Sequence, residues 1–178
     1  AAGMADKEVI VDGQHLTIPI PLIRVGAGVV KEVPQIAFDS LGHHPRNAVI
    51  LFDEAIRDFV TEYVWKPLSE AGMELDEFPL AAPDPAHHLV ASDAVGDAGA
   101  EALPANVDYI IGAGSGVLGD LTKWIANKRN IPFIIVGTAA SMNGHASITA
   151  AMTFGDIKET AYDLKIADAI IYDTDILT

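Results

Sequence analysis

Short, continuous apolar runs recur along the chain, separated by segments whose apolar residues follow helical spacing. The strand-like runs lie at residues 20–30, 48–52, 107–111, 131–136 and 169–172. Strands that are apolar at every position are typical of a sheet with both faces covered. The pattern therefore predicts an α/β fold, a Rossmann-like doubly wound parallel sheet with helices on both sides.

Four segments between these runs show helical periodicity. They cover residues 33–41, closed by Gly42, then 56–68, a weaker Ala-rich stretch at 85–103, and 117–129. Asp53 stands before the second of them, where its carboxylate can accept the free N–H groups of the first turn. Pro67 is expected to bend or end that helix, which Gly72 stops. Residues 151–166 favour a hairpin around Gly155.

The chain has 178 residues, half of them hydrophobic and 20% charged, which is a globular composition. No apolar stretch approaches the roughly 20 residues that a membrane helix needs. Residues 1–15 are expected to be a tag remnant and an N-terminal arm, because Ala1-Ala2-Gly3 precedes Met4 and does not read as a signal peptide. Residues 16–178 then form one domain, and a cytoplasmic location is expected.

Charge and cysteine content argue against several classes of function. The formal net charge of −14, from 25 acidic against 11 basic residues, repels phosphate backbones and makes nucleic-acid binding improbable. An anionic small ligand would need a local device against this repulsion, such as the N–H groups at the start of a helix. The absence of cysteine removes disulfides, thiolate nucleophiles and cysteine-based metal sites.

The six histidines do not form a known metal-binding motif. His43-His44 and His87-His88 are adjacent pairs, and neighbouring side chains point apart on a helix or strand. No His-Glu-x-x-His segment occurs, and His15 and His145 have no nearby partner in the sequence. A surface or packing role is expected for each histidine, and no metal site is predicted within these residues.

The clearest unit is a strand, a glycine-rich turn, a helix and a second strand. The turn reads Gly112-Ala113-Gly114-Ser115-Gly116 and joins 107–111 to 117–129, with the strand 131–136 completing a βαβ unit. Glycines let bare backbone approach a ligand, and the helix that follows offers unpaired N–H groups to a phosphate. Counted from Gly112, the segment does not match the Gly-x-Gly-x-x-Gly fingerprint, since Val117 holds the last position, and it is not a P-loop. Phosphate binding and a merely tight turn both remain open from this segment alone.

A second loop with ligand-binding character follows the strand at 131–136. Residues 137–147 read Gly-Thr-Ala-Ala-Ser-Met-Asn-Gly-His-Ala-Ser, a run of small hydroxyl and amide side chains. Ligands in open α/β sheets bind outside the carboxyl ends of the strands. Because the two strands are expected to be parallel neighbours, the glycine turn and this loop are predicted to meet at one crevice.

Three motifs follow one another in the second half of the chain. They are Gly114-Ser115-Gly116 with Asp120 and Lys123, then Ile131-Pro132 with Thr138-Ala139-Ala140-Ser141, and the closing Ile170-Ile171-Tyr172-Asp173-Thr174-Asp175-Ile176-Leu177. Together they resemble the sn-glycerol-1-phosphate dehydrogenases, which belong with glycerol dehydrogenases, iron-containing alcohol dehydrogenases and dehydroquinate synthases. The likeness spans roughly residues 20–178, with the specific motifs confined to 107–178.

The resemblance implies that residues 16–178 are a dinucleotide-binding domain for NAD or NADP. The cofactor-binding residues would be Gly114, Ser115, Gly116, Val117 and Leu118 at the pyrophosphate, Thr138, Ser141 and Ser147 in the second loop, and Asp53. Asp53 would hold the adenosine ribose, and a carboxylate there disfavours a 2′-phosphate and favours NAD. A plain helix cap is the alternative for Asp53. Asp120 and Lys123 are expected to form an ion pair with a structural role.

Four positions depart from the family's pattern. Asn143 stands where the family usually has an aspartate that helps to hold the polyol. The amide can still hydrogen-bond hydroxyls, so Asn143 is the candidate substrate-binding residue. Gly137 replaces the usual proline, Thr153 replaces an aromatic residue of some relatives, and His145 is unexpected at its place. These departures bear on the exact substrate more than on the cofactor.

The activity that the resemblance implies is interconversion of dihydroxyacetone phosphate and sn-glycerol 1-phosphate, or of a related polyol phosphate. The family binds a divalent metal (Zn, Ni or Fe) in a helical C-terminal domain, which is expected to begin after Leu177. No catalytic residue is therefore expected in this chain, which should bind but not turn over. The full-length protein is expected to be a homo-oligomer. A dehydroquinate synthase-like lyase and a stand-alone nucleotide-binding module are the alternatives.

Overall fold

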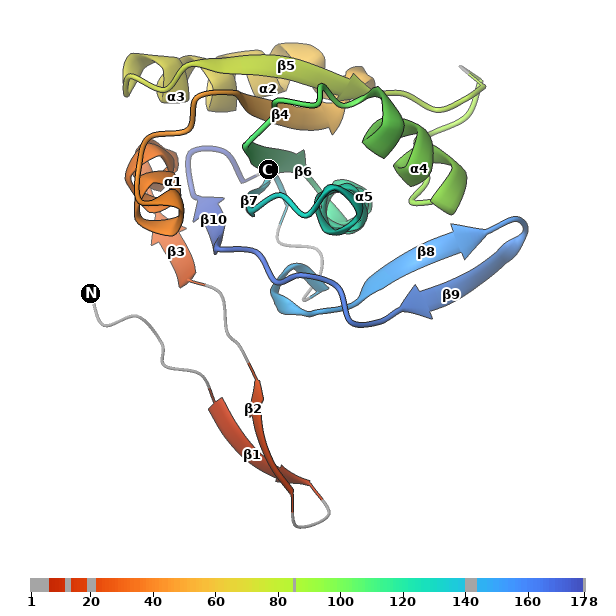
Figure 1. Cartoon of the computed structure of the whole chain (residues 1–178). Coiled ribbons are helices and arrows are strands. Elements are labelled where there is room, and N and C mark those ends of the chain that lie inside the picture. Colours follow the sequence, from red (N-terminus) through yellow and green to blue (C-terminus); the bar gives the residue numbers. More distant parts are fainter. Residues whose placement is uncertain (1–6, 12–13, 19–21, 85, 140–143, 178) are drawn as a thin grey trace.

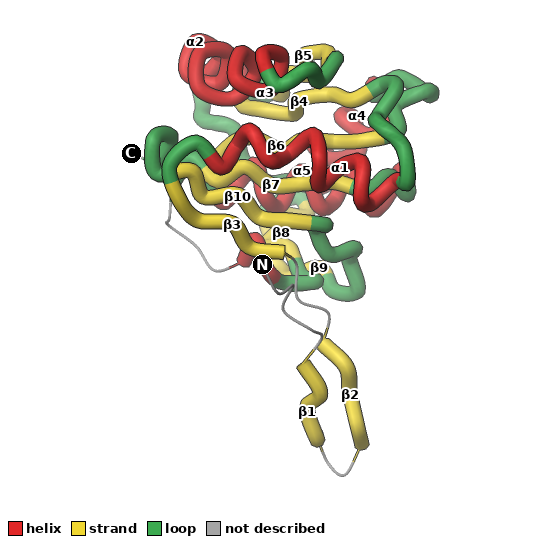
Figure 2. The backbone as a smooth tube through the Cα atoms, turned by 90° about the vertical axis from the view of Figure 1, so that its left-hand side faces the viewer, coloured by secondary structure: helices red, strands yellow, loops and turns green. Residues whose placement is uncertain are grey.

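The computed structural model describes residues 7–11, 14–18, 22–84, 86–139 and 144–177. Its centre is a six-stranded sheet in the order β3-β10-β7-β6-β4-β5, in which every neighbouring pair is parallel (Figure 1, Figure 2). The strands are β3 (Leu22–Gly26), β4 (Ala48–Asp53), β5 (Leu75–Leu80), β6 (Tyr109–Gly114), β7 (Phe133–Gly137) and β10 (Ala169–Asp173). The predicted parallel α/β fold is confirmed.

Helices cover both faces of this sheet. One face carries α1 (Val33–Leu41), α2 (Arg57–Val60), the π-helical turn η3 (Thr61–Trp65) and α3 (Lys66–Glu70), and the other carries α4 (Asp93–Ala102) and α5 (Gly116–Arg129) (Figure 1). Short 3₁₀ turns lie at η1 (Val29–Glu32), η2 (Glu54–Ile56) and η4 (Gly144–Ala146). No helix in the described ranges is long and apolar enough to cross a membrane.

The core has two layers, one on each side of the sheet. Successive residues of β4 supply both, because side chains alternate along a strand: Ile50 packs with α1 and α3, whereas Leu51 packs with α4 and α5. Both side chains are fully buried. Burial on both faces explains why the central strands are apolar at every position.

Two small antiparallel hairpins lie outside the main sheet (Figure 1). The pair β8 (Ala150–Phe154) and β9 (Ile157–Ala161) confirms the predicted hairpin, whose turn contains Gly155 with a φ of 59°. The pair β1 (Lys7–Val11) and β2 (Gln14–Ile18) was not predicted. Its second strand spans the boundary placed at residue 15, so the division into an arm and a domain stays a prediction.

The helix expected over 85–103 is wrong in its first half. Helix α4 begins at Asp93, after Ser92, whose hydroxyl accepts a hydrogen bond from the N–H of Val95 at 3.2 Å. The preceding segment pairs with β8 instead, because the Ala91 carbonyl accepts a hydrogen bond from the Thr153 N–H at 2.8 Å. Leu89 is buried in the core from this irregular segment, which mimics helical periodicity.

Strand β5 was missed, because its sequence Leu-Asp-Glu-Phe-Pro-Leu lacks the continuous apolar run of the other strands. It lies at the sheet edge beside β4, where one side of the backbone needs no partner strand and Pro79 is tolerated. The helix predicted over 56–68 is confirmed as the run α2-η3-α3. Its π-helical turn ends two residues before Pro67, which has no N–H to donate to the preceding turn.

The carboxylate of Asp173, at the end of β10, joins this strand to the turn after β3. It accepts hydrogen bonds from the N–H groups of Gly28 at 3.0 Å, Val30 at 2.9 Å and Asp175 at 3.0 Å. The residue is 1% exposed, so these N–H groups are satisfied by a buried charge rather than by water. An edge strand is thus fixed by a side chain from its neighbour.

Replacing Asp173 with Ala is expected to lower the free energy of unfolding by about 2–4 kcal/mol, because buried N–H groups lose their acceptor. Urea unfolding followed by circular dichroism measures the loss. Asp175→Ala is the matched control, since that side chain is exposed. Equal losses in the two variants would show that the three hydrogen bonds do not stabilise the fold.

Candidate functional site

The crevice between the carboxyl ends of β4 and β6 is the switch point of the sheet. From β4 the chain runs outward to β5 and then returns to β6 on the other side of β4. The connections that leave β4 and β6 therefore diverge, and parallel α/β sheets bind ligands at such a point. Asp53 is the last residue of β4 and Gly114 is the last of β6, so two predicted cofactor-binding residues flank the crevice.

The glycine turn brings the start of helix α5 directly onto the end of β6. A Cβ at Gly112 would lie 2.2 Å from the Thr122 hydroxyl oxygen, and one at Gly114 would lie 2.6 Å from Leu118 Cβ. Both contacts are far below van der Waals separation, so these glycines are required for packing. The tight-turn interpretation is thereby supported, and it does not compete with ligand binding.

The first turn of α5 borders a cavity and lacks a side-chain cap. The N-cap residue is Ser115, and its side chain makes no capping hydrogen bond. Ser115, Gly116 and Val117 are half-buried, whereas Leu118 is buried against the core. Backbone N–H groups at a helix start have no partner within the helix and carry a partial positive charge. This end of α5 can therefore bind an anion.

The second predicted loop meets the glycine turn. The N–H of Thr138 donates to the Gly114 carbonyl at 3.0 Å, and Gly137 pairs with Gly114 in the β6–β7 register. The predicted convergence of the two loops is thus confirmed, with Thr138 buried at their junction. Ser141 and Asn143, predicted for cofactor and substrate, lie outside the described residues.

Lys123 fixes the far side of this loop to α5. Its ammonium group lies 3.3 Å from Asp120 Oδ1 and donates to the carbonyl of Gly144 at 2.7 Å and to that of Thr149. The side chain is fully buried, and burial lowers the pKa of Lys123 although Asp120 opposes the shift. The predicted ion pair is confirmed. The contacts to two loop carbonyls were missed, because spacing along one helix does not show what packs on it.

Ser147 lies within the segment that Lys123 holds. Its hydroxyl donates to the Gly144 carbonyl at 2.8 Å and accepts from the N–H of Thr149 at 3.3 Å. Ser147 therefore shapes the loop by local hydrogen bonds, and its contact with a cofactor stays a prediction.

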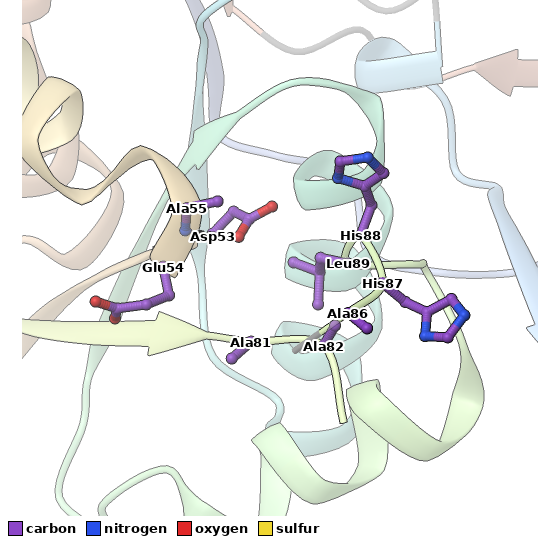
Figure 3. A pocket seen from close by; sticks show the side chains of 9 residues that line it. All are labelled: Asp53, Glu54, Ala55, Ala81, Ala82, Ala86, His87, His88 and Leu89. Atoms are coloured by element: carbon purple, nitrogen blue, oxygen red, sulfur yellow. Dashed lines mark hydrogen bonds between the residues drawn. The ribbon is translucent and has the colours of Figure 1, made fainter. Parts of the chain in front are cut away.

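Asp53 lines a cavity of about 360 Å³ at the end of β4. Its carboxylate accepts a hydrogen bond from the N–H of Ala55 at 2.9 Å and caps the turn η2, so the capping role is confirmed. The carboxylate also points across the cavity toward the segment that carries His88 and Leu89, whereas the ring of His87 points away (Figure 3). Capping and ligand binding are compatible, and the ribose contact stays a prediction.

A second cavity, of about 290 Å³, borders the open turn of α5. Gly116 and Val117 line it together with Asp120, Thr153 and Val90. Val90 directly follows Leu89 of the Asp53 cavity, so one segment of chain lies between the two cavities. Thr153, noted for its departure from the family, thus borders the predicted pyrophosphate turn.

The described histidines differ in their exposure to solvent. His43 and His87 are exposed, with His87 at 3.0 Å from Asp84, and His145 is buried beside Tyr172. Within the described ranges, no three His, Asp or Glu side chains gather as metal ligands would.

The sequence profile of the family "Iron-containing alcohol dehydrogenase" matches residues 24–178. Curated relatives include two proteins named glycerol-1-phosphate dehydrogenase [NAD(P)+]. The one from Methanococcoides burtonii is 27% identical over 172 residues, covering 93% of this chain and 44% of the relative. The one from Bacillus velezensis is 37% identical over 75 residues, covering 42% of this chain and 19% of the relative. The chain thus spans less than half the length of either.

Solved structures agree on the fold. A glycerol dehydrogenase from Schizosaccharomyces pombe superposes with a TM-score of 0.71 at 20% identity, over 97% of this chain and 41% of that one. A 1,3-propanediol oxidoreductase gives a TM-score of 0.72 at 19% identity, over 89% of this chain and 45% of that one. With the profile covering most of the sequence, the chain belongs to the iron-containing alcohol dehydrogenase family, of which it contains the Rossmann-like α/β domain.

Proposed function

We propose that this chain binds the dinucleotide of an NAD(P)-dependent, metal-assisted dehydrogenase that acts on a polyol phosphate. The observation that carries the proposal is the uncapped start of α5 at the switch point of the sheet, next to the second loop. Neutral N–H donors and a helix dipole suit a pyrophosphate. The named relatives favour dihydroxyacetone phosphate and sn-glycerol 1-phosphate as substrate and product.

The two cavities support one orientation of the proposed dinucleotide. The adenosine end would occupy the cavity of Asp53, the pyrophosphate would bind at Gly114 to Leu118, and the nicotinamide would extend along the cavity beside Thr153. In this arrangement Thr138, Ser141 and Ser147 would border the cofactor, and Asn143 the substrate. The carboxylate of Asp53 would accept hydrogen bonds from ribose hydroxyls and repel a 2′-phosphate.

This chain's part in the reaction is to bind and orient. A bound nicotinamide would supply the hydride for the carbon that bears the secondary alcohol, and the residues of this chain would set their relative position. The resemblance assigns a divalent metal to a further domain, so turnover is proposed only for a protein that also contains it.

Calorimetric titration of the chain with NADH and NADPH, with EDTA present throughout, tests the proposal. Binding of either nucleotide without metal is the expected result, and tighter binding of NADH is expected from Asp53. If neither nucleotide binds, the chain is not a self-sufficient cofactor domain and the proposal is wrong for it.

Gly116→Val is expected to weaken dinucleotide binding at least tenfold, because its methyl groups would occupy the space beside the open helix turn. Gly116→Ala should give an intermediate loss. The melting temperature should fall by only a few degrees, since Gly116 is half-buried at a helix start. Unchanged affinity in both variants would contradict the assignment of the turn.

Asp53→Asn is expected to separate the two roles of Asp53. The amide oxygen can still accept the hydrogen bond from Ala55, so the free energy of unfolding should change little. Binding of NADH should weaken and binding of NADPH should weaken less, because the negative charge is gone. Asp53→Ala, which also loses the cap, should cost about 1 kcal/mol of stability. Equal losses for both nucleotides would leave Asp53 a helix cap only.

A further inference from the structure

A buried histidine and a tyrosine connect the cofactor loop to the start of α5. His145 is 1% exposed, and its Nδ1 lies 2.9 Å from the hydroxyl of Tyr172 on β10. The planes of the two rings are inclined by 30°, with centroids 6.0 Å apart. The other ring nitrogen, Nε2, is also buried, and no described atom completes a hydrogen bond to it.

Two glycines make room for this pair. A Cβ at Gly119, in the first turns of α5, would lie 2.4 Å from the His145 ring. A Cβ at Gly137, at the end of β7, would lie 2.5 Å from the Tyr172 ring. Gly137 and His145 are two of the positions at which this chain departs from the family's pattern. Their departures are therefore parts of one packing arrangement.

The surroundings favour a neutral imidazole. Burial is the main cause that lowers the pKa of His145, and the charge of Lys123 adds to the shift. The Ser115 carbonyl and Asp120 act in the opposite direction. Burial raises the pKa of Tyr172, so its hydroxyl keeps its proton. The Tyr172 hydroxyl can then donate to Nδ1 of a ring that carries its proton on Nε2.

We propose that His145, oriented by Tyr172, is a positioning residue that fixes the loop 144–149 against the first turns of α5, so that dinucleotide affinity depends on a neutral imidazole. The proposal rests on the proposed function for its cofactor-binding consequence. Lys123 already holds the loop at Gly144 and Thr149. His145 adds a contact with α5 at Gly119, which follows the first turn of the helix and precedes Asp120.

The expected pH dependence follows from the lowered pKa. A histidine that is neutral in the fold takes up a proton more readily when its site opens. The contribution of neutral His145 to the stability of the fold is therefore fully present above its unperturbed pKa of 6.5. It is lost as the pH falls from 6.5 through the lowered pKa of the folded protein. Protonation would also place a second cation beside Lys123.

The test measures NADH and NADPH affinity by calorimetry between pH 5.5 and 8 in four proteins: wild type, Tyr172→Phe, His145→Gln and His43→Gln. Wild-type affinity should fall as the pH drops through the lowered pKa of His145. Tyr172→Phe should weaken binding about five- to tenfold at pH 8, the effect of one hydrogen bond. His145→Gln should bind more weakly still and lose the fall at low pH. His43→Gln, an exposed histidine, should match the wild type.

Hydrogen exchange separates failure of this proposal from failure of the proposed function. Amides of 144–149 and 115–119 should exchange faster in Tyr172→Phe than in wild type, with or without nucleotide. If wild type binds neither nucleotide, the proposed function is wrong, and the exchange rates then decide the positioning role. Wild-type exchange and an unaltered pH profile in His145→Gln would overturn the proposal.

A rescue experiment distinguishes positioning from general loss of packing. Gly137→Ala alone should weaken nucleotide binding, because the new Cβ meets the Tyr172 ring. Gly137→Ala combined with Tyr172→Val removes that clash but leaves His145 without its partner. The double variant should recover the melting temperature but not the affinity. Recovery of both would show that Tyr172 only fills space, which contradicts the proposal.

Discussion

Helix α5 can lie against the end of β6 only because Gly112 and Gly114 carry no side chain. A Cβ at either position would fall 2.2 Å or 2.6 Å from an atom of α5 itself. This approach places the open turn of α5 at the switch point between β4 and β6, where connections diverge. A helix displaced outward by even one methyl group would present the same N–H groups to solvent instead of to the crevice.

The same approach brings α5 under the second loop. Lys123 points from the helix into that loop, where two carbonyls and Asp120 surround its ammonium group. Burying a cation costs several kcal/mol unless such partners replace its water. The loop thus keeps Lys123 satisfied and Lys123 keeps the loop in place. The glycine turn and the loop therefore act as one wall of the crevice, joined also by the bond from Thr138 to Gly114.

The strands of the central sheet were predictable because burial on both faces leaves a continuous apolar run. Strand β5 was not, since an edge strand with one solvated side keeps polar residues such as Asp76 and Glu77. The meeting of Gly114 and Thr138 could be predicted from the order of the strands along the chain, because the carboxyl ends of parallel neighbours lie at the same edge of the sheet. The contact between His145 and Tyr172 joins residues 27 apart on different elements, and a single sequence carries no signal for such a pair.

Because the net charge is −14, any binding of an anion must depend on groups close to the binding site. A pyrophosphate approaching this protein meets an unfavourable field at long range, which salt screens beyond about 10 Å. The buried cation Lys123 is already engaged by carbonyls and by Asp120. The donors beside the cavity at the start of α5 are the neutral N–H groups of its first turn and the side chain of Lys158. The N–H donors keep their alignment only if the turn is held rigid, because a dipole loses its effect when it rotates. Rigidity of the first turn, supplied by glycine packing below it and by the loop beside it, is therefore expected to preserve the effect of these dipoles on an anion. An acidic chain can bind an anionic dinucleotide by this means without a cluster of basic residues.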